Sequence, residues 1–414
     1  MANRVTVIGA GIVGICTTLS LLEKGFVVEM VDSDLPGEGA SHGNAGVISP
    51  WSSVPQSMPG VLHNVPKWLC DPDGPLAIKW SYAPRLIPWL LKFVQAGLKH
   101  RLPTIADAMY ALNRPNIEIY RRHLDGTGHE QLLIDSLYVH VYRNPVDADL
   151  KQLAWRMREE LGVPLQVVDD GELHEIEPAL SAEYKAAVLI KAQARALDPR
   201  GICKALAEKA LSMGATFRQT EIKHISPAPN GGWIMHSADG EYTTEKLVIA
   251  AGAWSARLLA PLGVSVPLEA ERGYHLVLKN PGIVINNSIM DTERKFVTSS
   301  MNAGVRCAGT AEFAGLDAPP NYRRARVFKR LVKKLFPEIN VDESEEWMGT
   351  RPSFPDSLPC IGGVPGHDNL FAAFGHSHYG FGMAPNTGRI VADLVGGQTS
   401  SIDLTPYRVD RFNG

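Results

Sequence analysis

The stretch that decides the fold lies at the start of the chain, where residues 4–32 read RVTVIGAGIVGICTTLSLLEKGFVVEMVD. Residues 4–8 form a short run rich in β-branched side chains, which is typical of a buried strand, and a glycine-rich turn follows at once. Residues 15–24 are typical of a helix that Gly25 ends, and residues 26–32 read as a second strand that closes on an acid. This order predicts a dinucleotide-binding β-α-β unit.

Each residue of the motif has a separate expected role. Gly9 allows the tight turn out of the strand, Gly11 lets a pyrophosphate approach the backbone, and Gly14 lets the helix pack on the strand. Asp32 follows Gly14 at close to the spacing of about 20 residues that the unit requires. Its carboxylate would accept hydrogen bonds from ribose hydroxyls and repel a 2′-phosphate, which argues against NADP. A glycine turn in an ordinary α/β protein is the alternative interpretation.

Length and composition narrow the function classes. A chain of 414 residues with 45% hydrophobic and 21% charged residues is expected to form about two globular domains. The net charge of −3 gives no electrostatic case for a nucleic-acid partner. The sequence contains no HExxH, CxxC or P-loop pattern, so no metal is expected. The five scattered cysteines predict reduced thiols in a cytoplasmic protein.

One segment could touch a membrane. Residues 80–98 are apolar and rich in tryptophan and leucine, with Lys79, Arg85, Lys92 and Lys99 among or beside them. That composition suits a peripheral contact on the inner face of the plasma membrane. A helix packed on the body of the protein is the alternative, and it is the one that the composition favours.

Nucleotide-type units recur along the chain. A second buried strand runs into a glycine turn at residues 247–254, and a third, at residues 370–374, precedes a glycine-rich segment and a helix. Between residues 273 and 309 apolar residues often alternate, which predicts an antiparallel sheet. We therefore predict an α/β protein with a Rossmann-like nucleotide-binding domain assembled from residues 1–135, 194–262 and 341–414. An α+β substrate domain is expected at residues 136–193 and 263–340.

Four motifs give the chain a family likeness. They are residues 7–14 with Asp32, residues 41–50 (SHGNAGVISP), residues 272–274 (RGY), and residues 349–352 (GTRP) followed by the glycine loop at 375–383. With them the chain resembles the D-amino-acid oxidase and dehydrogenase superfamily of FAD enzymes, and within it the bacterial D-amino-acid dehydrogenases of the small-subunit type. The likeness spans almost the whole chain.

The resemblance implies FAD as the cofactor, and three glycine-rich segments suit a long cofactor threaded through one domain. Backbone N–H groups after Gly380 would stabilise negative charge on the reduced flavin. The residues expected to contact the cofactor are Gly9, Gly11, Ile12, Val13, Gly14, Asp32, Ser33, Ser41, His42, Asn44, Ala45, Gly46, Val47, Ile222, Ala251, Gly252, Trp254, Gly380, Phe381, Gly382 and Met383. Some relatives bond flavin covalently to a histidine, which makes His42 a weak candidate for such a link.

The resemblance also implies a substrate site. Arg351 matches the arginine that binds the substrate carboxylate, with a surface salt bridge as the alternative. Tyr274 would donate its hydroxyl to the same carboxylate or else pack on the sheet. His376 and His378 lie in the glycine loop. His378 departs from the glycine common in the oxidases and is expected either to point into the substrate pocket or to cap the loop.

These features predict oxidative deamination of an amino acid, most simply a D-amino acid, by hydride transfer from the α-carbon to flavin N5. The imine that forms would hydrolyse to a keto acid. Glycine, sarcosine, hydroxyproline or an iminodiacetate-like secondary amine is the alternative substrate, with a quinone or oxygen as electron acceptor. A non-catalytic flavoprotein subunit is the alternative of another class. The sequence leaves the choice between oxidase and dehydrogenase open, and the oligomeric state as well.

Overall fold

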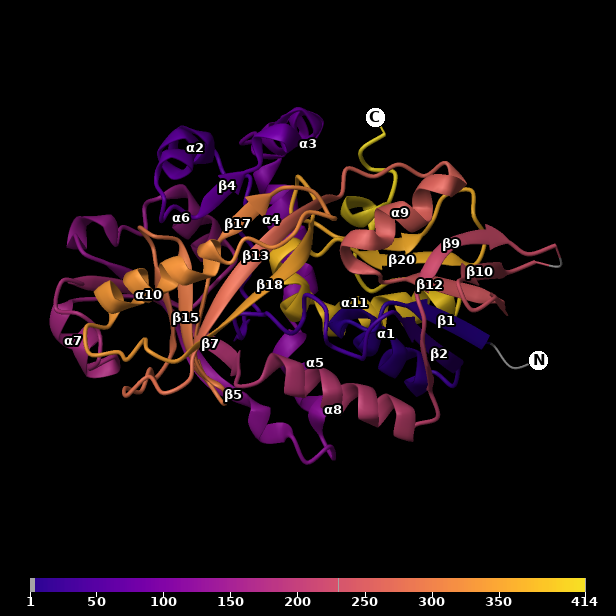
Figure 1. Ribbon diagram of the computed structural model, residues 1–414, viewed down its shortest axis with the longest axis horizontal. Coiled ribbons are helices and arrows are strands. Elements are labelled where there is room, and N and C mark those ends of the chain that lie inside the picture. The colour runs from indigo at the N-terminus through magenta and orange to yellow at the C-terminus, as the bar shows by residue number, and fades with distance from the viewer. Residues whose placement is uncertain (1–3, 230, 414) are drawn as a thin grey trace.

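The computed structural model describes residues 4–229 and 231–413. Figure 1 shows two lobes side by side, each built around its own sheet. The lobe that contains the N-terminal strand holds the nucleotide-type unit, and the other lobe holds a larger sheet with a helix across one face.

The first lobe contains a six-stranded sheet in the order β19-β20-β12-β1-β2-β8. The strands are β19 (Cys360–Gly363), β20 (Leu370–Phe374), β12 (Lys246–Ile249), β1 (Arg4–Ile8), β2 (Val27–Asp32) and β8 (Thr216–Gln219). All neighbours run parallel except β19, which is antiparallel to β20. The predicted Rossmann-like unit with a doubly wound sheet is therefore confirmed.

Helices and a small sheet cover the parallel sheet. The helices are α1 (Ile12–Glu23), α8 (Pro199–Ser212), α9 (Ser255–Leu259) and α11 (Gly380–Val395), and the small sheet consists of β9 (Ile222–Pro227), β10 (Trp233–Ser237) and β11 (Glu241–Thr244). Val5 and Val7 of β1 belong to one core with Ile390 of α11, while Ile249 of β12 packs with Trp233 on the other face. The central strands β1 and β12 are mostly buried and apolar because both faces of the sheet are covered, whereas the edge strand β8 reads TFRQ and is largely exposed or half-buried.

The second lobe contains an eleven-stranded sheet in which most neighbours are antiparallel. Its main path is β3 (Val47–Ile48), β7 (Ala186–Ala196), β5 (Leu133–Tyr142), β14 (Ser288–Asp291), β15 (Phe296–Met301), β16 (Gly304–Ala308), β13 (Glu269–Leu278), β17 (Ala311–Phe313) and β4 (Leu76–Ile78), with β18 (Ser344–Ser353) on β13 and β6 (Leu165–Val168) on β7. The amphipathic helix α10 (Arg323–Leu335) inserts Phe328 and Leu331 into the core of this sheet.

The division of the chain between the two sheets differs from the expected boundaries at three places. The prediction gave residues 341–414 to the nucleotide-binding domain, but β18 pairs with β13 along all ten of its residues. The short strands β3 and β4 also join the large sheet, although they lie within residues 1–135. The domain division remains a prediction, and β18 brings residues 344–353 to the substrate side.

The remaining helices lie outside the two sheets. They are α2 (Val61–Cys70), α3 (Ala83–Ala96), α4 (Leu102–Asn113), α5 (Asn116–Leu124), α6 (Leu153–Glu160) and α7 (Asp170–Ile176). Helices α4 and α5 are separate because Pro115 interrupts them. Within residues 4–229 and 231–413, no helix is long and apolar enough to cross a membrane.

Candidate active site

A cavity of about 970 Å³ runs between the two lobes, from the turn after β1 to the large sheet. Its inner part is bordered by the β1–α1 turn, the end of β2, the loop at 39–45, the turn after β12 and the start of α11. Its outer part is bordered by β13, β17 and β18 and by α2 and α3. The motifs found in the sequence therefore meet around one space.

The turn between β1 and α1 has the form that a phosphate group requires. Gly9 adopts φ +110°, and a Cβ at Gly14 would lie 1.8 Å from the carbonyl oxygen of Gly9. A Cβ on Gly11 would meet only the hydroxyl of Ser41, at 3.4 Å, because Gly11 faces the cavity. The N-cap residue Gly11 has no side chain to cap α1, and the first N–H of the helix, that of Ile12, donates to the Ser41 hydroxyl at 3.0 Å. The positive end of the helix faces the cavity, where an anion would be stabilised.

Asp32 stands at the end of β2 beside this turn. One carboxylate oxygen accepts a hydrogen bond from the backbone N–H of Ala10 at 2.6 Å, and the other accepts one from Asp34 at 3.1 Å. Burial raises the pKa of Asp32 from its ordinary value, although these hydrogen bonds oppose the shift. The carboxylate is thus fixed at the cavity wall next to Ser33, where ribose hydroxyls would reach it.

Most of the predicted cofactor residues line the cavity. They are Gly9, Gly11, Ile12, Val13, Asp32, Ser33, Ser41, Asn44, Ala45, Val47, Ile222, Ala251, Gly252, Trp254, Gly380, Phe381 and Gly382. Four others take structural positions among the described residues. Gly14 packs against the Gly9 carbonyl, Gly46 has φ +82° and lies against the carbonyl of Ala196, and Met383 is buried in the core.

His42 is the fourth of these residues. Its ring stacks on Trp347 with centroids 5.5 Å apart, and its Nδ1 lies 3.6 Å from a carboxylate oxygen of Glu38. Burial lowers the pKa of His42 and the charge of Arg306 adds to this shift. Arg306 also donates to the carbonyl oxygens of His42 and Asn44, at 2.9 and 2.7 Å, so the large sheet holds the loop in place.

The glycine loop at 375–383 contributes a second helix N-terminus to the cavity. Helix α11 begins at Gly380, and no side chain of the described residues caps it. His376 lines the cavity, and its Nε2 bonds to the hydroxyl of Thr387 at 3.0 Å. Burial lowers the pKa of His376 to about 3, so its ring is a neutral structural group.

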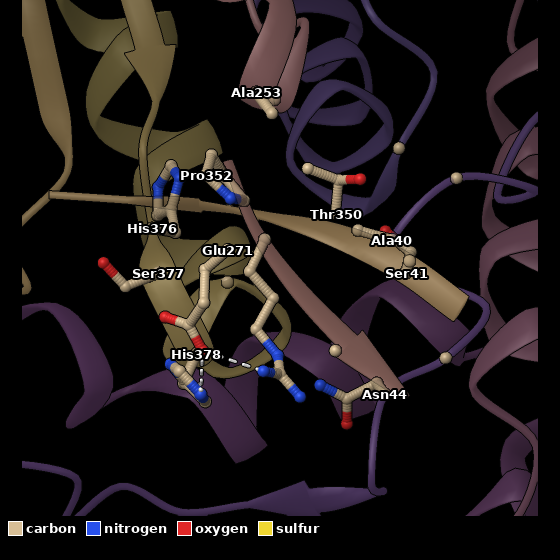
Figure 2. Close-up of a pocket in the computed structure, with 18 of the residues that line it drawn as sticks. Ala40, Ser41, Asn44, Ala253, Glu271, Thr350, Pro352, His376, Ser377 and His378 are labelled. Carbon is tan, nitrogen blue, oxygen red and sulfur yellow. Dashed lines mark hydrogen bonds and ion pairs between the residues drawn. The ribbon is translucent and has the colours of Figure 1, made fainter. Parts of the chain in front are cut away.

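A charged cluster forms at the substrate end, where β13 and β18 lie side by side. The register of the two strands places Arg351 opposite Glu271. The Arg351 guanidinium donates from Nη1 to Glu271 at 2.9 Å and to the Thr310 carbonyl at 3.1 Å. Nε2 of His378 lies 3.0 Å from the same Glu271 oxygen. Figure 2 shows Glu271 directed at His378 and draws these contacts as dashed lines.

Glu271 is ionised in this cluster. Burial alone would raise the pKa of its carboxyl, but the facing His378 and Arg351 and a hydrogen bond from Ser353 at 2.8 Å lower it to about 2. Burial lowers the pKa of His378, and only Glu271 opposes that shift. We therefore assign a neutral His378 that carries its proton on Nε2 and donates it to Glu271.

Tyr274 borders the cavity, but its hydroxyl is engaged within the large sheet. The hydroxyl donates to Glu312 at 2.6 Å and accepts from the backbone N–H of Asn321 at 2.9 Å. The side chain is 1% exposed, and burial raises its pKa to about 12. The expected donation of Tyr274 to the substrate carboxylate stays a prediction.

Glu271 was missed in the sequence, as were Ser353, which donates to it, and Thr310, whose carbonyl accepts from Arg351. The signal that could have found it is the alternation along β13, which places Glu271 on the same face as Gly273. The partner strand β18 is distant in the sequence, so no local pattern reveals that Arg351 is opposite.

Comparison with known proteins gives the family of the chain. A family model described as "FAD dependent oxidoreductase" (DAO) matches residues 4–394. The chain belongs to this family. It is 36% identical over 99% of both chains to a D-amino-acid oxidase of Bradyrhizobium diazoefficiens, and 33% identical, again over 99% of both, to a D-amino acid dehydrogenase of Paramagnetospirillum magneticum. The crystal structure of glycine oxidase from Geobacillus kaustophilus superposes with a TM-score of 0.74 at 24% identity, covering 99% of each chain.

The cofactor of this DAO protein is therefore FAD, and the cavity fits it. Two helix N-termini, those of α1 and α11, open on the same space at different points along its length. A long cofactor with an anionic pyrophosphate in its middle and a ring that becomes anionic at one end meets both requirements. Asp32 lies at the α1 end and the Arg351 cluster near the α11 end, which gives the cofactor its direction.

Proposed function

We propose that this protein catalyses the oxidative deamination of an α-amino acid, in the first place a D-amino acid. The observation that carries the proposal is the Arg351 guanidinium, which reaches the cavity beside the start of α11. Both hydrogen bonds that Arg351 makes to described residues are donated by Nη1, so Nη2 and Nε are left to donate to a ligand. A buried guanidinium of this kind binds a carboxylate in bidentate fashion. The names of the two curated relatives support the D-configuration.

The residues of the chain bind and orient the substrate. Arg351 holds the carboxylate, and Gly273 leaves room for the guanidinium over strand β13. Bound FAD supplies the oxidising power, because it accepts a hydride from the substrate α-carbon and leaves an imine that water hydrolyses to a keto acid and ammonia. A substrate held with its α-hydrogen toward the cofactor reacts at a greatly increased effective concentration.

An anaerobic substrate screen tests this proposal. The purified holoenzyme is mixed with single D- and L-amino acids, glycine, sarcosine or iminodiacetate, and the flavin absorbance is followed. Bleaching by D-amino acids supports the proposal. Bleaching only by glycine or by a secondary amine supports the alternative substrates, to which the likeness to glycine oxidase points, and bleaching by none supports a non-catalytic subunit.

We further propose that a membrane quinone is the electron acceptor. The observation that favours it is the outer face of α3, where Ile87, Leu91 and Val94 are exposed at helical spacing, Leu91 by 61%. Trp80, just before this helix, is 78% exposed. The adjoining part of the cavity is lined by apolar residues of α2 and α3, so a lipophilic acceptor would meet an apolar passage.

The membrane contact is tested by sedimentation with vesicles of anionic phospholipid. We expect the wild-type holoenzyme to sediment with the vesicles and Leu91→Glu to remain in the supernatant, because a charged side chain on this face opposes insertion. Leu211→Glu on α8 is the matched control, since Leu211 is also an exposed apolar residue but lies on another helix. Equal sedimentation of both variants and the wild type would contradict the contact.

A further inference from the structure

Glu271 places a negative charge where the proposed reaction needs only a positive one. Its side chain is 3% exposed, and it lies in the substrate end of the cavity next to Arg351. A guanidinium that only had to bind a carboxylate would attract it more strongly without an ionised neighbour. The Glu271 carboxylate therefore has a second purpose, and its third partner, His378, indicates which one.

His378 is the member of the cluster that reaches the ligand space. Its side chain is 31% exposed and lines the cavity, while Glu271 lies behind it. With the proton on Nε2 bonded to Glu271, the lone pair of Nδ1 is turned away from the carboxylate. The side-chain amide nitrogen of Gln56 contacts Nδ1 and also lies 3.1 Å from Nε2, so an N–H group already stands beside this edge of the ring. The ammonium group of an amino acid is a donor of the same kind.

Resting on the proposed function, we propose that His378 accepts the α-ammonium proton of the bound amino acid and that Glu271 is its positioning residue. The ammonium N–H bond breaks, its electron pair stays on the substrate nitrogen, and the proton becomes Nδ1–H of an imidazolium. The Glu271 carboxylate stabilises that imidazolium through the Nε2–H bond. The resulting neutral amine carries the electron pair that loss of hydride from the α-carbon requires.

The charges of the site stay balanced through this transfer. The bound carboxylate and Glu271 are negative, Arg351 is positive, and the second positive charge moves from the ammonium to His378. The other groups that face the imidazole are Tyr379, whose pKa burial raises to about 12, and the uncharged Gln56. Without Glu271 the imidazolium and Arg351 would share the bound carboxylate as their one counter-charge in this cluster, so His378 would be a weaker acceptor.

The kinetic test compares Glu271→Gln and His378→Gln with Glu269→Gln in the holoenzyme. Glu269 is a buried carboxylate on the same strand, bonded to Tyr82, and it does not line the cavity among the described residues. The rate constant of anaerobic flavin reduction is measured from about pH 6 to about pH 10. We expect both test variants to lose about 100-fold at pH 7 and to recover as the free amine deprotonates, while the control keeps the wild-type profile.

A second readout needs no turnover. Protein with ¹³C-labelled histidine is studied by NMR, and the His378 resonance is assigned as the one that is absent from the spectrum of His378→Gln. The chemical shift of this resonance is then followed as a function of pH. We expect it to titrate at lower pH in Glu271→Gln, because the carboxylate that favours the imidazolium is gone. An unmoved titration, or a kinetic loss that is equal at every pH, would overturn the inference. If Glu271→Gln does not fold, His378→Gln decides the kinetic test. Failure of the proposed function gives a different result, because then no amino acid would reduce the flavin of the wild-type protein.

Discussion

Gly273 leaves the space that the Arg351 guanidinium occupies: a Cβ at Gly273 would lie 2.3 Å from Cζ of Arg351. The two residues belong to neighbouring strands, β13 and β18, and Gly273 pairs with Gly349, two residues from Arg351. The glycine of the Arg272-Gly273-Tyr274 motif is thus explained by close approach of a side chain rather than by a turn.

Gly273→Ala is expected to displace Arg351 without unfolding the sheet. A guanidinium that moves by about 1 Å presents its donors wrongly, so kcat/KM for a carboxylate substrate should fall on the order of 10- to 100-fold. Flavin absorbance after gel filtration should be unchanged. Gly363→Ala in β19 is the matched control, because a Cβ there has open space, and it should keep full activity. Full activity of Gly273→Ala would mean that Arg351 does not hold the substrate in this position.

The contrast between α1 and β18 shows what could be predicted from the sequence. Strand β1, the glycine turn and Asp32 are contiguous, and each residue type has one physical role there, so the nucleotide-binding unit could be predicted in detail. The pairing of β18 with β13 depends on a register between distant segments. Nothing near Arg351 in the sequence indicates that Glu271 will stand opposite, so the ion pair at the centre of the site was not predictable.

Tyr274 shows how a family likeness and strand geometry lead to different expectations. The likeness places its hydroxyl on the substrate carboxylate, whereas in the structure the hydroxyl bonds to Glu312 and to the Asn321 N–H. Side chains of adjacent strand residues point to opposite sides, so that of Tyr274 points away from the side on which Glu271 contacts Arg351. The role of Tyr274 at the substrate stays a prediction.

Tyr274→Phe is accordingly expected to affect stability more than catalysis. Its hydroxyl donates to Glu312 and accepts from the Asn321 N–H, and removal of these two hydrogen bonds should lower the free energy of unfolding by about 1–3 kcal/mol. The value of kcat/KM should stay within about threefold of wild type. Urea unfolding and steady-state kinetics measure the two effects, with the exposed Tyr322→Phe as control. A large rise in KM in a stably folded variant would return Tyr274 to the substrate site.

Arg351→Met is expected to lower both activity and stability. Removal of one partner of a buried pair leaves Glu271 uncompensated, which should lower the free energy of unfolding at pH 7 by about 3 kcal/mol. The double variant with Glu271→Gln should recover much of this loss. Arg326→Met is the control, since Arg326 forms an exposed pair with Glu346 and should cost less than about 1 kcal/mol. An equal loss in Arg351→Met and in the double variant would mean that the pair is not coupled.

The acid dependence of stability follows from the same pair. The pKa of Glu271 in the folded protein is lowered to about 2, below that of an unfolded glutamate, so its stabilising effect is complete above the unfolded pKa. That stability is lost as the pH falls toward 2 and the carboxyl becomes protonated. In Arg351→Met the pKa of Glu271 rises, and the part of the acid-induced loss that comes from this residue should diminish.

Gly11→Val and Gly14→Val are expected to fail in different ways. A Cβ at Gly11 meets only the Ser41 hydroxyl, so the variant should fold, but its branched side chain occupies the space that the pyrophosphate of FAD requires. A Cβ at Gly14 would overlap the Gly9 carbonyl at 1.8 Å, where neither the helix nor the turn can yield, so this variant should lose more than about 4 kcal/mol. Circular dichroism and the flavin-to-protein absorbance ratio separate the two results. A Gly11→Val protein that retains a full complement of FAD would contradict the placement of the cofactor against this turn.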